Sequence, residues 1–396
     1  MDEAASARLH EVLGSYVDRG LVPGLVAAVA RGAEDDEVHV AALGSLSFDD
    51  GALPMRADSL FRITSMTKPV VAVAALSLVQ EGRLDLDEPV DRLLPELASP
   101  RVLVRPDGPL EETVPAERPV TVEDVLTFRL GWGTPAADFP SWPLFVAAER
   151  LGLCIGPPLP RPSIGQDEWL ARLGSLPLLH QPGEAWRYDV GASVLGVLVA
   201  RAAGRSLPEV LDERVLEPLG MADTGWHVPP EDLDRLTTSY GPDEAGGLQV
   251  FDPGGGASAW ATPPTFPDGA SGLVCTIGDY VTFGRFLLGD GASRSGRRVL
   301  SPELIERTTT DRLTPAQRSD PMAEPFLAGG GWGYGVGVDP EGRHGWVGGF
   351  GTAWRNVPPA AGEPGRVEVV LSQRAVYQEP IDLFPDFWAV ADLSAV

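Results

Sequence analysis

The chain has 396 residues, of which 43% are hydrophobic and 22% are charged, a composition typical of a globular protein with a large core. Its 56 acidic residues outnumber its 31 lysines and arginines, so the formal net charge is −25. A field of that sign repels nucleic-acid phosphate and anionic lipid headgroups, which excludes nucleic acid and membrane surfaces as expected partners.

The first part of the chain predicts an amphipathic helix, two strands and a buried helix. Apolar residues near helical spacing predict the helix over residues 6–19, and short apolar runs predict strands over 24–30 and 38–43. The stretch 66–80 is apolar on all sides, as expected of a helix that lies inside the core.

From residue 84 to 185 the chain is rich in proline and in short helix signals. Two apolar helices are then predicted, over 191–203 and 207–219. The remaining predictions are an irregular Gly/Pro-rich stretch at 241–268, a helix at 278–288, strands at 333–338, 352–356 and 367–373, and a last helix at 381–393.

Strands at both ends of the chain and a mostly helical middle predict two structural parts. An α/β sheet part is expected to comprise residues 1–83 and 190–396. A mainly helical insertion is expected at 84–189. The junction of two such parts is a common place for a cleft, so the active site is expected there.

Lys68 is the only lysine in the chain, and every other basic residue is an arginine. Arginine cannot act as a general base because its pKa stays above ~12, so a single remaining lysine is a candidate for chemistry. Ser65 lies three residues earlier, on the same helix face, within reach of the amine. A helix N-terminus would favour an alkoxide on Ser65 and disfavour the protonated amine. The alternative is an N-cap serine beside a solvated lysine.

The segment FRITSMTKPVVAVAALSLVQEGRLDLDEPVDRLLPE is similar to the nucleophile segment of the serine β-lactamase-related proteins. These include class C β-lactamases, DD-peptidases and family VIII carboxylesterases. Three later segments resemble the family in the same order: VTVEDVLTFRLGWG, PGEAWRYDVGASVLGVLVARAAG and GASGLVCTIGDYVTFGRFLLGDG. The resemblance runs from about residue 7 to 390. It implies an α/β (α+β) fold in which an antiparallel sheet is flanked by helices, with a mostly helical second domain and the active site between them.

The resemblance implies that Tyr188 is the second catalytic group. A phenol with a pKa near ~10 needs a cationic neighbour to act as a base near neutrality, and Lys68 is the only lysine available. The two would share one proton, so the base belongs to the pair. The alternative for Tyr188 is a core tyrosine whose hydroxyl is satisfied. The family pattern also implies an oxyanion hole made by the backbone N–H groups of Ser65 and Gly349.

The sequence departs from the β-lactamase pattern at two points. Residues 188–190 read Tyr-Asp-Val where the family has Tyr-x-Asn, and residues 346–348 read Trp-Val-Gly where it has Lys-Thr-Gly or His-x-Gly. The second motif resembles the Trp-x-Gly of family VIII esterases and implies that Trp346 and Gly348 contact substrate. Losing both the amide and the cation argues against a β-lactam and favours neutral esters. His344 is expected on the surface or at a strand end.

These residues predict a cytoplasmic serine hydrolase, a carboxylesterase in which Ser65 forms an acyl-enzyme and the Lys68/Tyr188 pair moves the proton. The alternatives are an acyltransferase, a DD-peptidase or β-lactamase-type amide hydrolase, and a non-catalytic binding protein of this fold. The last predicts loss of the three catalytic side chains, all of which are present. The expected partner is a small-molecule acyl substrate. No metal or organic cofactor is implied, and the oligomeric state stays open.

Other features add context to this prediction. The N-terminal segment carries acids where a signal peptide needs basic residues, and Cys154 and Cys275 form no disulfide framework, which fits a reducing compartment. No Gly-x-Ser-x-Gly elbow of an α/β-hydrolase is present. The aromatic residues between Trp132 and Trp169 are expected to line an acyl pocket, to form a lid or to belong to the core; the others are Phe139, Trp142 and Phe145.

Overall fold

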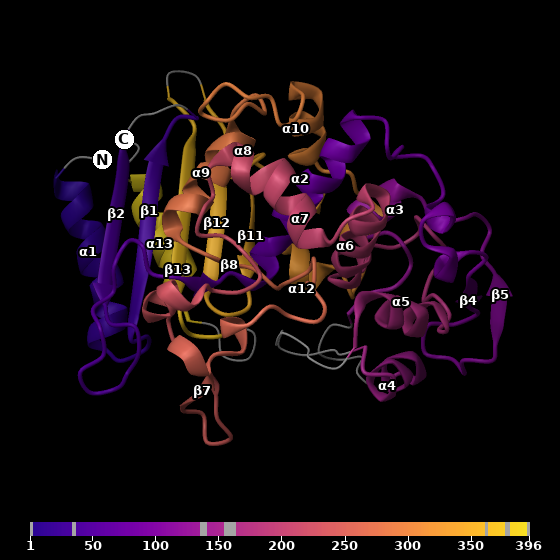
Figure 1. Cartoon of the computed structure of the whole chain (residues 1–396), viewed down its shortest axis with the longest axis horizontal. Coiled ribbons are helices and arrows are strands. Elements are labelled where there is room, and N and C mark those ends of the chain that lie inside the picture. The colour runs from indigo at the N-terminus through magenta and orange to yellow at the C-terminus, as the bar shows by residue number, and fades with distance from the viewer. Residues whose placement is uncertain are drawn as a thin grey trace.

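The computed structural model describes residues 3–33, 37–134, 141–153, 164–360, 363–376 and 381–393. Within these residues a seven-stranded sheet has the order β2-β1-β13-β12-β11-β10-β9, and every neighbouring pair is antiparallel (Figure 1). The strands are β1 Gly24–Arg31, β2 Val38–Gly44, β9 Gly331–Trp332, β10 Gly337–Val338, β11 His344–Gly348, β12 Thr352–Val357 and β13 Arg366–Ser372. The predicted antiparallel sheet is confirmed, and its strands come from the two ends of the chain.

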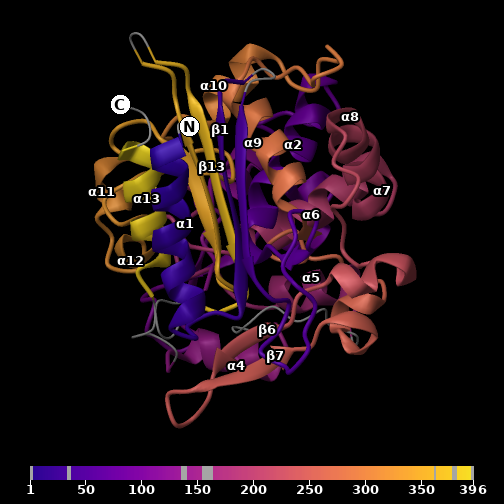
Figure 2. The same cartoon turned by 90° about the vertical axis from the view of Figure 1, so that its left-hand side faces the viewer.

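Helices cover both faces of this sheet (Figure 2). Helices α1 (Glu3–Asp18) and α13 (Leu383–Leu393) pack together on one face, and α9 (Ile277–Leu288) and α2 (Thr67–Gln80) lie on the other. Strand β1 is buried along nearly its whole length because both of its faces are covered. Helix α2 is buried from its first residue to Leu78, which confirms the helix predicted from its uniformly apolar sequence.

A second group of elements, which includes α3, α4, α5, β4 and β5, lies at the far end of the molecule from α1 (Figure 1). Helix α6 packs against α2 and α3 and so joins this group to the core. The remaining elements are β3 Phe61–Arg62, η1 Thr64–Met66, η2 Val90–Arg92, η3 Pro95–Leu97, β4 Arg101–Leu103, β5 Thr113–Pro115, α3 Val122–Leu126, α4 Pro143–Arg150, α5 Gln166–Gly174, α6 Val190–Ala203, α7 Leu207–Leu211, η4 Asp212–Leu216, α8 Glu217–Leu219, η5 Pro230–Arg235, β6 Ser239–Pro242, β7 Leu248–Asp252, η6 Gly255–Ala257, η7 Ala259–Ala261, β8 Val274–Cys275, α10 Pro302–Thr308, α11 Pro315–Arg318 and α12 Glu324–Leu327.

None of the described helices is by itself both long and apolar enough to cross a bilayer. Helix α6 and the segment Leu207–Leu219 meet the length and composition criteria only together, across a bend of 79°.

The structure corrects three predictions about strands. The stretch 241–268, expected to be irregular, contains most of the β6–β7 hairpin. Of the strand expected at 333–338, only residues 337 and 338 form a strand, β10. Residues 333–336 form the turn between β9 and β10, closed by a 2.8 Å hydrogen bond from the N–H of Gly333 to the carbonyl of Val336. Gly333 lies directly against the carbonyl of Thr308, so only a glycine fits there. Strand β11 is an element that the glycine-rich sequence HGWVG did not indicate.

The described aromatic residues of the 132–169 region belong mainly to the core. Trp132, Phe145 and Trp169 are buried, and the rings of Trp132 and Phe145 meet edge to face with centroids 6.1 Å apart. Trp142 is half-buried and stacks on Phe145. Phe139 lies outside the described residues. The sequence left three interpretations open for these residues: an acyl pocket, a lid or the core. The described side chains fit the core.

His344 begins β11 and is 5% exposed, so the strand-end expectation is confirmed and the surface expectation is wrong. The amide of Asn356 donates to Nε2 of His344 at 3.1 Å and to the carbonyl of Gly284 at 2.7 Å. Its amide oxygen accepts from the indole of Trp354 at 2.8 Å. The only asparagine of the chain is therefore a core residue, and burial lowers the pKa of His344 to about 4.

This burial predicts an acid-sensitive fold. Between pH 6.5 and about 4 the unfolded chain binds a proton at His344 and the folded chain does not, so the free energy of unfolding falls as the pH drops through this window. The contribution is up to about 3 kcal/mol. Denaturant unfolding of wild type and His344→Gln at pH 7, 5.5 and 4.5 checks it. We expect a shallower pH dependence in the variant, and equal slopes would contradict the assignment.

Candidate active site

Ser65 lies in η1, the short 3₁₀ turn between β3 and α2. It is half-buried, whereas its neighbours Thr64 and Met66 are buried, so Ser65 is the residue of this turn that solvent reaches. Thr64 has φ of +41°, an unfavourable backbone conformation that costs on the order of 1–3 kcal/mol. Because η1 begins at Thr64, the N–H of Ser65 has no acceptor within its own turn.

Lys68, in the first turn of α2, is 1% exposed and contacts three oxygen atoms. Its Nζ donates to Ser65 Oγ at 2.8 Å and to the carbonyl of Ala270 at 2.8 Å, and it forms an ion pair with Asp189 Oδ1 at 2.7 Å. The predicted contact between the serine and the lysine is therefore present. The carbonyl of Ala270 and the carboxylate of Asp189 add two acceptors that the motif did not predict.

The environment of Lys68 favours its charged form. Burial alone lowers the pKa of Lys68, but the charges of Asp189 and Tyr188 outweigh burial and hold the pKa above its ordinary value. The expectation that the helix N-terminus would favour the neutral amine is therefore wrong for this site. A carboxylate in direct contact acts more strongly than the partial charge of a helix end.

Tyr188 lies beside Lys68, the residue that contacts Ser65. The Nζ of Lys68 is 4.7 Å from the centroid of the tyrosine ring. The ring stacks on Phe326 of α12, with centroids 4.5 Å apart, and on Trp186 at 5.8 Å. Its hydroxyl accepts a 2.8 Å hydrogen bond from Nε1 of Trp346. The phenol is therefore fixed between aromatic rings, with a cation at its face and a donor at its oxygen.

The residue before Tyr188 anchors this segment. Arg187 is buried and donates to both carboxylate oxygens of Asp320, at 2.8 and 3.1 Å. Its guanidinium also lies 2.6 Å from the ring nitrogen Nε2 of His180. These contacts hold the tyrosine segment against the loop before α12, and the carboxylate of Asp320 compensates the positive charge of Arg187.

Strand β11 carries Trp346 and Gly348 and packs against the serine turn, and Gly349 directly follows the strand. A side chain at Gly348 would collide with the carbonyl of Ile63 and with Thr64 Oγ1, so only glycine permits this approach. The carbonyl of Gly349 accepts from the N–H of Val376 at 2.9 Å. Among the described residues the N–H of Gly349 has no acceptor, so it can donate to a ligand, as an oxyanion hole requires.

The structure thus brings Ser65, Lys68, Tyr188 and the Trp346–Gly349 segment together from three distant parts of the chain. Sequence reasoning missed the ion pair of Asp189, the carbonyl of Ala270 and the stacking ring of Phe326. Asp189 stood out only as the neighbour of Tyr188. No sequence signal marked Ala270 or Phe326, because both reach the site through long-range packing.

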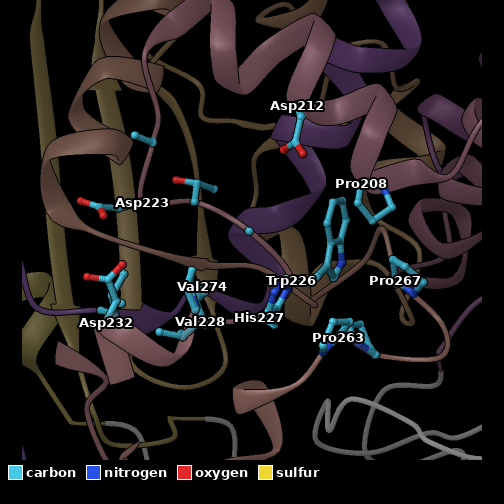
Figure 3. Close-up of a pocket in the computed structure, with 16 residues that line it drawn as sticks. Pro208, Asp212, Asp223, Trp226, His227, Val228, Asp232, Pro263, Pro267 and Val274 are labelled. Atoms are coloured by element: carbon cyan, nitrogen blue, oxygen red, sulfur yellow. The ribbon is translucent and has the colours of Figure 1, made fainter. Parts of the chain in front are cut away.

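A cavity of about 380 Å³ is lined in part by Pro267 and Val274, which flank the loop that carries Ala270 (Figure 3). Trp226, His227, Asp212 and Pro263 are among its lining residues. The indole of Trp226 donates to the carbonyl of Asp268 at 3.2 Å and forms the wall toward this loop. None of the predicted site residues lines this cavity.

In the part of the chain that the structure describes, no three side chains of His, Cys, Asp or Glu converge in a way that could hold a metal ion. Cys275 is a buried free thiol, and burial raises its pKa well above the ordinary value. A thiol of this kind is unreactive. Cys154 lies outside the described residues.

Known proteins resemble this chain over most of its length. Protein Rv1367c of Mycobacterium tuberculosis is 41% identical over 359 residues, 87% of this chain and 84% of the relative. Esterase EstB of Burkholderia gladioli is 39% identical over 229 residues, which are 57% of this chain and 53% of the relative. The structure of EstCE1, described as a hydrolase with promiscuous acyltransferase activity, superposes with a TM-score of 0.79 at 23% identity and covers 100% of this chain and 99% of its own. The sequence model of the beta-lactamase family matches residues 9–383, and the chain belongs to this family.

Proposed function

We propose that the protein is a serine hydrolase that cleaves neutral carboxylic esters through an acyl-enzyme on Ser65. The observation that carries the proposal is the hydrogen bond between Oγ of the half-buried Ser65 and the buried Nζ of Lys68, which in turn lies 4.7 Å from the centroid of the Tyr188 ring. A nucleophilic hydroxyl needs such neighbours to lose its proton. The name of EstB, an esterase, supports ester chemistry for this chain.

In this scheme Ser65 Oγ attacks the ester carbonyl while the phenolate of Tyr188 takes its proton. The ammonium group of Lys68 and the indole N–H of Trp346 stabilise that phenolate. The backbone N–H groups of Ser65 and Gly349 donate to the oxyanion of the tetrahedral intermediate. Tyr188 then returns the proton to the leaving alcohol, and water attacks the acyl-enzyme with the same assistance. The scheme uses no metal or organic cofactor.

The charges around Ser65 favour a neutral acyl group. The cation that contacts the serine, Lys68, is already paired with Asp189, and the nearby Arg187 is paired with Asp320. The position that resembles the family's third motif carries the indole of Trp346, whose N–H is bonded to Tyr188. A carboxylate on the substrate would therefore meet no free positive charge from these residues and would approach Asp189.

Acyl transfer is the second candidate, because the same acyl-enzyme serves it and the description of EstCE1 names both activities. Purified enzyme is assayed with p-nitrophenyl butyrate and with a chromogenic cephalosporin, and the ester assay is repeated with an added primary alcohol. We expect fast ester cleavage and little cephalosporin cleavage. Dominant cephalosporin cleavage would contradict the proposal. Butyrate ester as the main product with the alcohol would identify a transferase.

Trp346→Phe tests the hydrogen bond to Tyr188 while keeping an aromatic ring in place. Loss of a donor to the phenolate costs about 1.5–3 kcal/mol, so less of Tyr188 is ionised at neutral pH and kcat/KM for p-nitrophenyl butyrate should fall about 10- to 100-fold. The acidic limb of the pH profile should move to higher pH, because the phenolate is less stabilised. An unchanged profile with a raised KM would instead indicate that Trp346 acts only by contacting substrate.

A further inference from the structure

Asp189 occupies a backbone conformation that is rare for a residue with a side chain. Its φ is +77° and its ψ is −66°, and the N–H of Val190 bonds to the carbonyl of Tyr188 at 3.1 Å across it. These features define a classical γ-turn, which is strained and costs on the order of 1–3 kcal/mol. The turn lies between Tyr188 and helix α6, so it sets the direction of both side chains at residues 188 and 189.

The side chain of Asp189 does not perform the usual task of an aspartate at this position. Asp189 is the N-cap residue of α6, where an aspartate normally accepts from a backbone N–H of the first turn. Within the described residues its carboxylate makes no such cap bond and is instead paired with Lys68 Nζ at 2.7 Å. The aspartate therefore gives up a cap interaction and adopts a strained turn in order to reach the lysine.

The lysine needs this carboxylate. The side chain of Lys68 is 0% exposed, whereas that of Asp189 is 35% exposed. An isolated ammonium ion in such a buried place is strongly disfavoured, and a paired one with three oxygen neighbours is not. Besides Asp189, the acceptors around Nζ are Ser65 Oγ and the carbonyl of Ala270, both uncharged.

We propose that Asp189 is a positioning residue that holds Lys68 as an ammonium ion against Ser65 and thereby leaves Tyr188 as the group that takes the serine proton. The part of this proposal that concerns the proton of Ser65 rests on the proposed esterase function; the charge state of Lys68 does not. In the step itself the Ser65 O–H bond breaks, the proton passes to the Tyr188 oxygen, and the Ser65 oxygen forms its bond to the carbonyl carbon. The ammonium group keeps its three protons throughout.

Three ionisable groups face Lys68: Asp189, Tyr188 and Asp268. Asp268 accepts from Ser193 Oγ at 2.6 Å and from the N–H of Ala270 at 2.9 Å, so its carboxylate stabilises the loop that carries Ala270. Asp189 is the one that forms the ion pair. Removing the negative charge of Asp189 lowers the pKa at which the Lys68/Tyr188 pair loses a proton, whichever of the two residues loses it.

Because Lys68 is the only lysine, selective ¹³C/¹⁵N-lysine labelling gives one side-chain NMR signal, which reads Lys68 directly and without substrate. In the wild type we expect this signal to keep its ammonium shift up to and beyond the ordinary lysine value of about 10.4. In Asp189→Asn the midpoint should fall by at least about one pH unit, by the loss of one charge in contact. Asp189→Glu should resemble the wild type. The control Asp167→Asn removes an exposed carboxylate from its pair with Arg201 and should leave the midpoint unchanged.

A neutral amine at pH 7 in the wild type, or equal midpoints in wild type and Asp189→Asn, would overturn the proposal. The wild-type titration alone decides the charge state should Asp189→Asn fail to fold. The kinetic counterpart is the pH profile of kcat/KM for p-nitrophenyl butyrate, whose acidic limb should move down by at least about one unit in Asp189→Asn and return in Asp189→Glu. An unmoved limb in a folded, active variant counts against the positioning role. Absence of Ser65-dependent hydrolysis in the wild type would refute the esterase, while the NMR titration would still report on Lys68.

Discussion

Ser65→Ala is expected to lower the turnover of p-nitrophenyl butyrate by about 10⁴-fold or more, the scale of losing the nucleophile in other serine hydrolases. The substitution removes the oxygen that forms the acyl-enzyme and leaves its surroundings in place. Ser65 is half-buried, and its hydroxyl contacts Lys68, which keeps Asp189 and the carbonyl of Ala270. We therefore expect thermal unfolding of the variant to stay close to that of the wild type.

Ser77→Ala is the matched control for this variant. Ser77 lies in α2, the helix that follows the serine turn, and its hydroxyl donates to the carbonyl of Ala74 at 2.7 Å, away from the site. Activity of this control should match the wild type. A folded Ser65→Ala enzyme with more than a tenth of wild-type turnover would exclude Ser65 as the nucleophile.

Tyr188→Phe is expected to lower kcat by about 10²- to 10⁴-fold, the range of losing a general base. Phenylalanine preserves the stacking on Phe326 and Trp186 and removes only the oxygen that accepts from Trp346. Because substrate contacts are retained, KM should change little. Steady-state kinetics with p-nitrophenyl butyrate at several pH values measures both parameters.

Tyr240→Phe provides the same chemical change elsewhere. The hydroxyl of Tyr240 accepts from the N–H of Phe48 at 2.9 Å in another part of the fold, so its removal should leave kcat unchanged. If Tyr188→Phe retains most of its kcat, the serine proton goes to another group. Lys68 is then the candidate base, and the lysine NMR titration of the wild type would be expected to show a neutral amine.

The local part of the site could be predicted from the sequence. Ser65 and Lys68 are three residues apart, in the 3₁₀ turn and the first turn of the helix that follows it, and the helical spacing predicted their contact. Tyr188 and Trp346 were identified only through the family resemblance. Their hydrogen bond depends on how β11 and the turn before α6 pack, which no local pattern contains. The parts assigned to residues 1–83, 84–189 and 190–396 remain a prediction.

The ion pair of Asp189 could not be predicted for a physical reason. Its carboxylate reaches Lys68 through a positive φ angle that aspartate rarely adopts, and propensity points instead to a helix cap. Strands such as β1 and β13 were predictable from their apolar runs, and the antiparallel arrangement of the sheet was implied by the family resemblance. Strand β11 was not predictable, because two of its five residues are the glycines Gly345 and Gly348. Neighbouring backbone atoms approach these two positions too closely for a side chain.

The central claim is that Ser65 carries the acyl group, and the most direct measurement is covalent trapping with a p-nitrophenyl alkylphosphonate. This reagent forms a stable adduct with an activated serine and releases p-nitrophenolate as it reacts. Peptide mass spectrometry then locates the adduct while residual ester hydrolysis is followed in the same sample. The account predicts that the phosphonyl group lies on Ser65 and that activity disappears in proportion to its occupancy. Full inactivation with Ser65 unmodified, or an adduct on another residue, would contradict it.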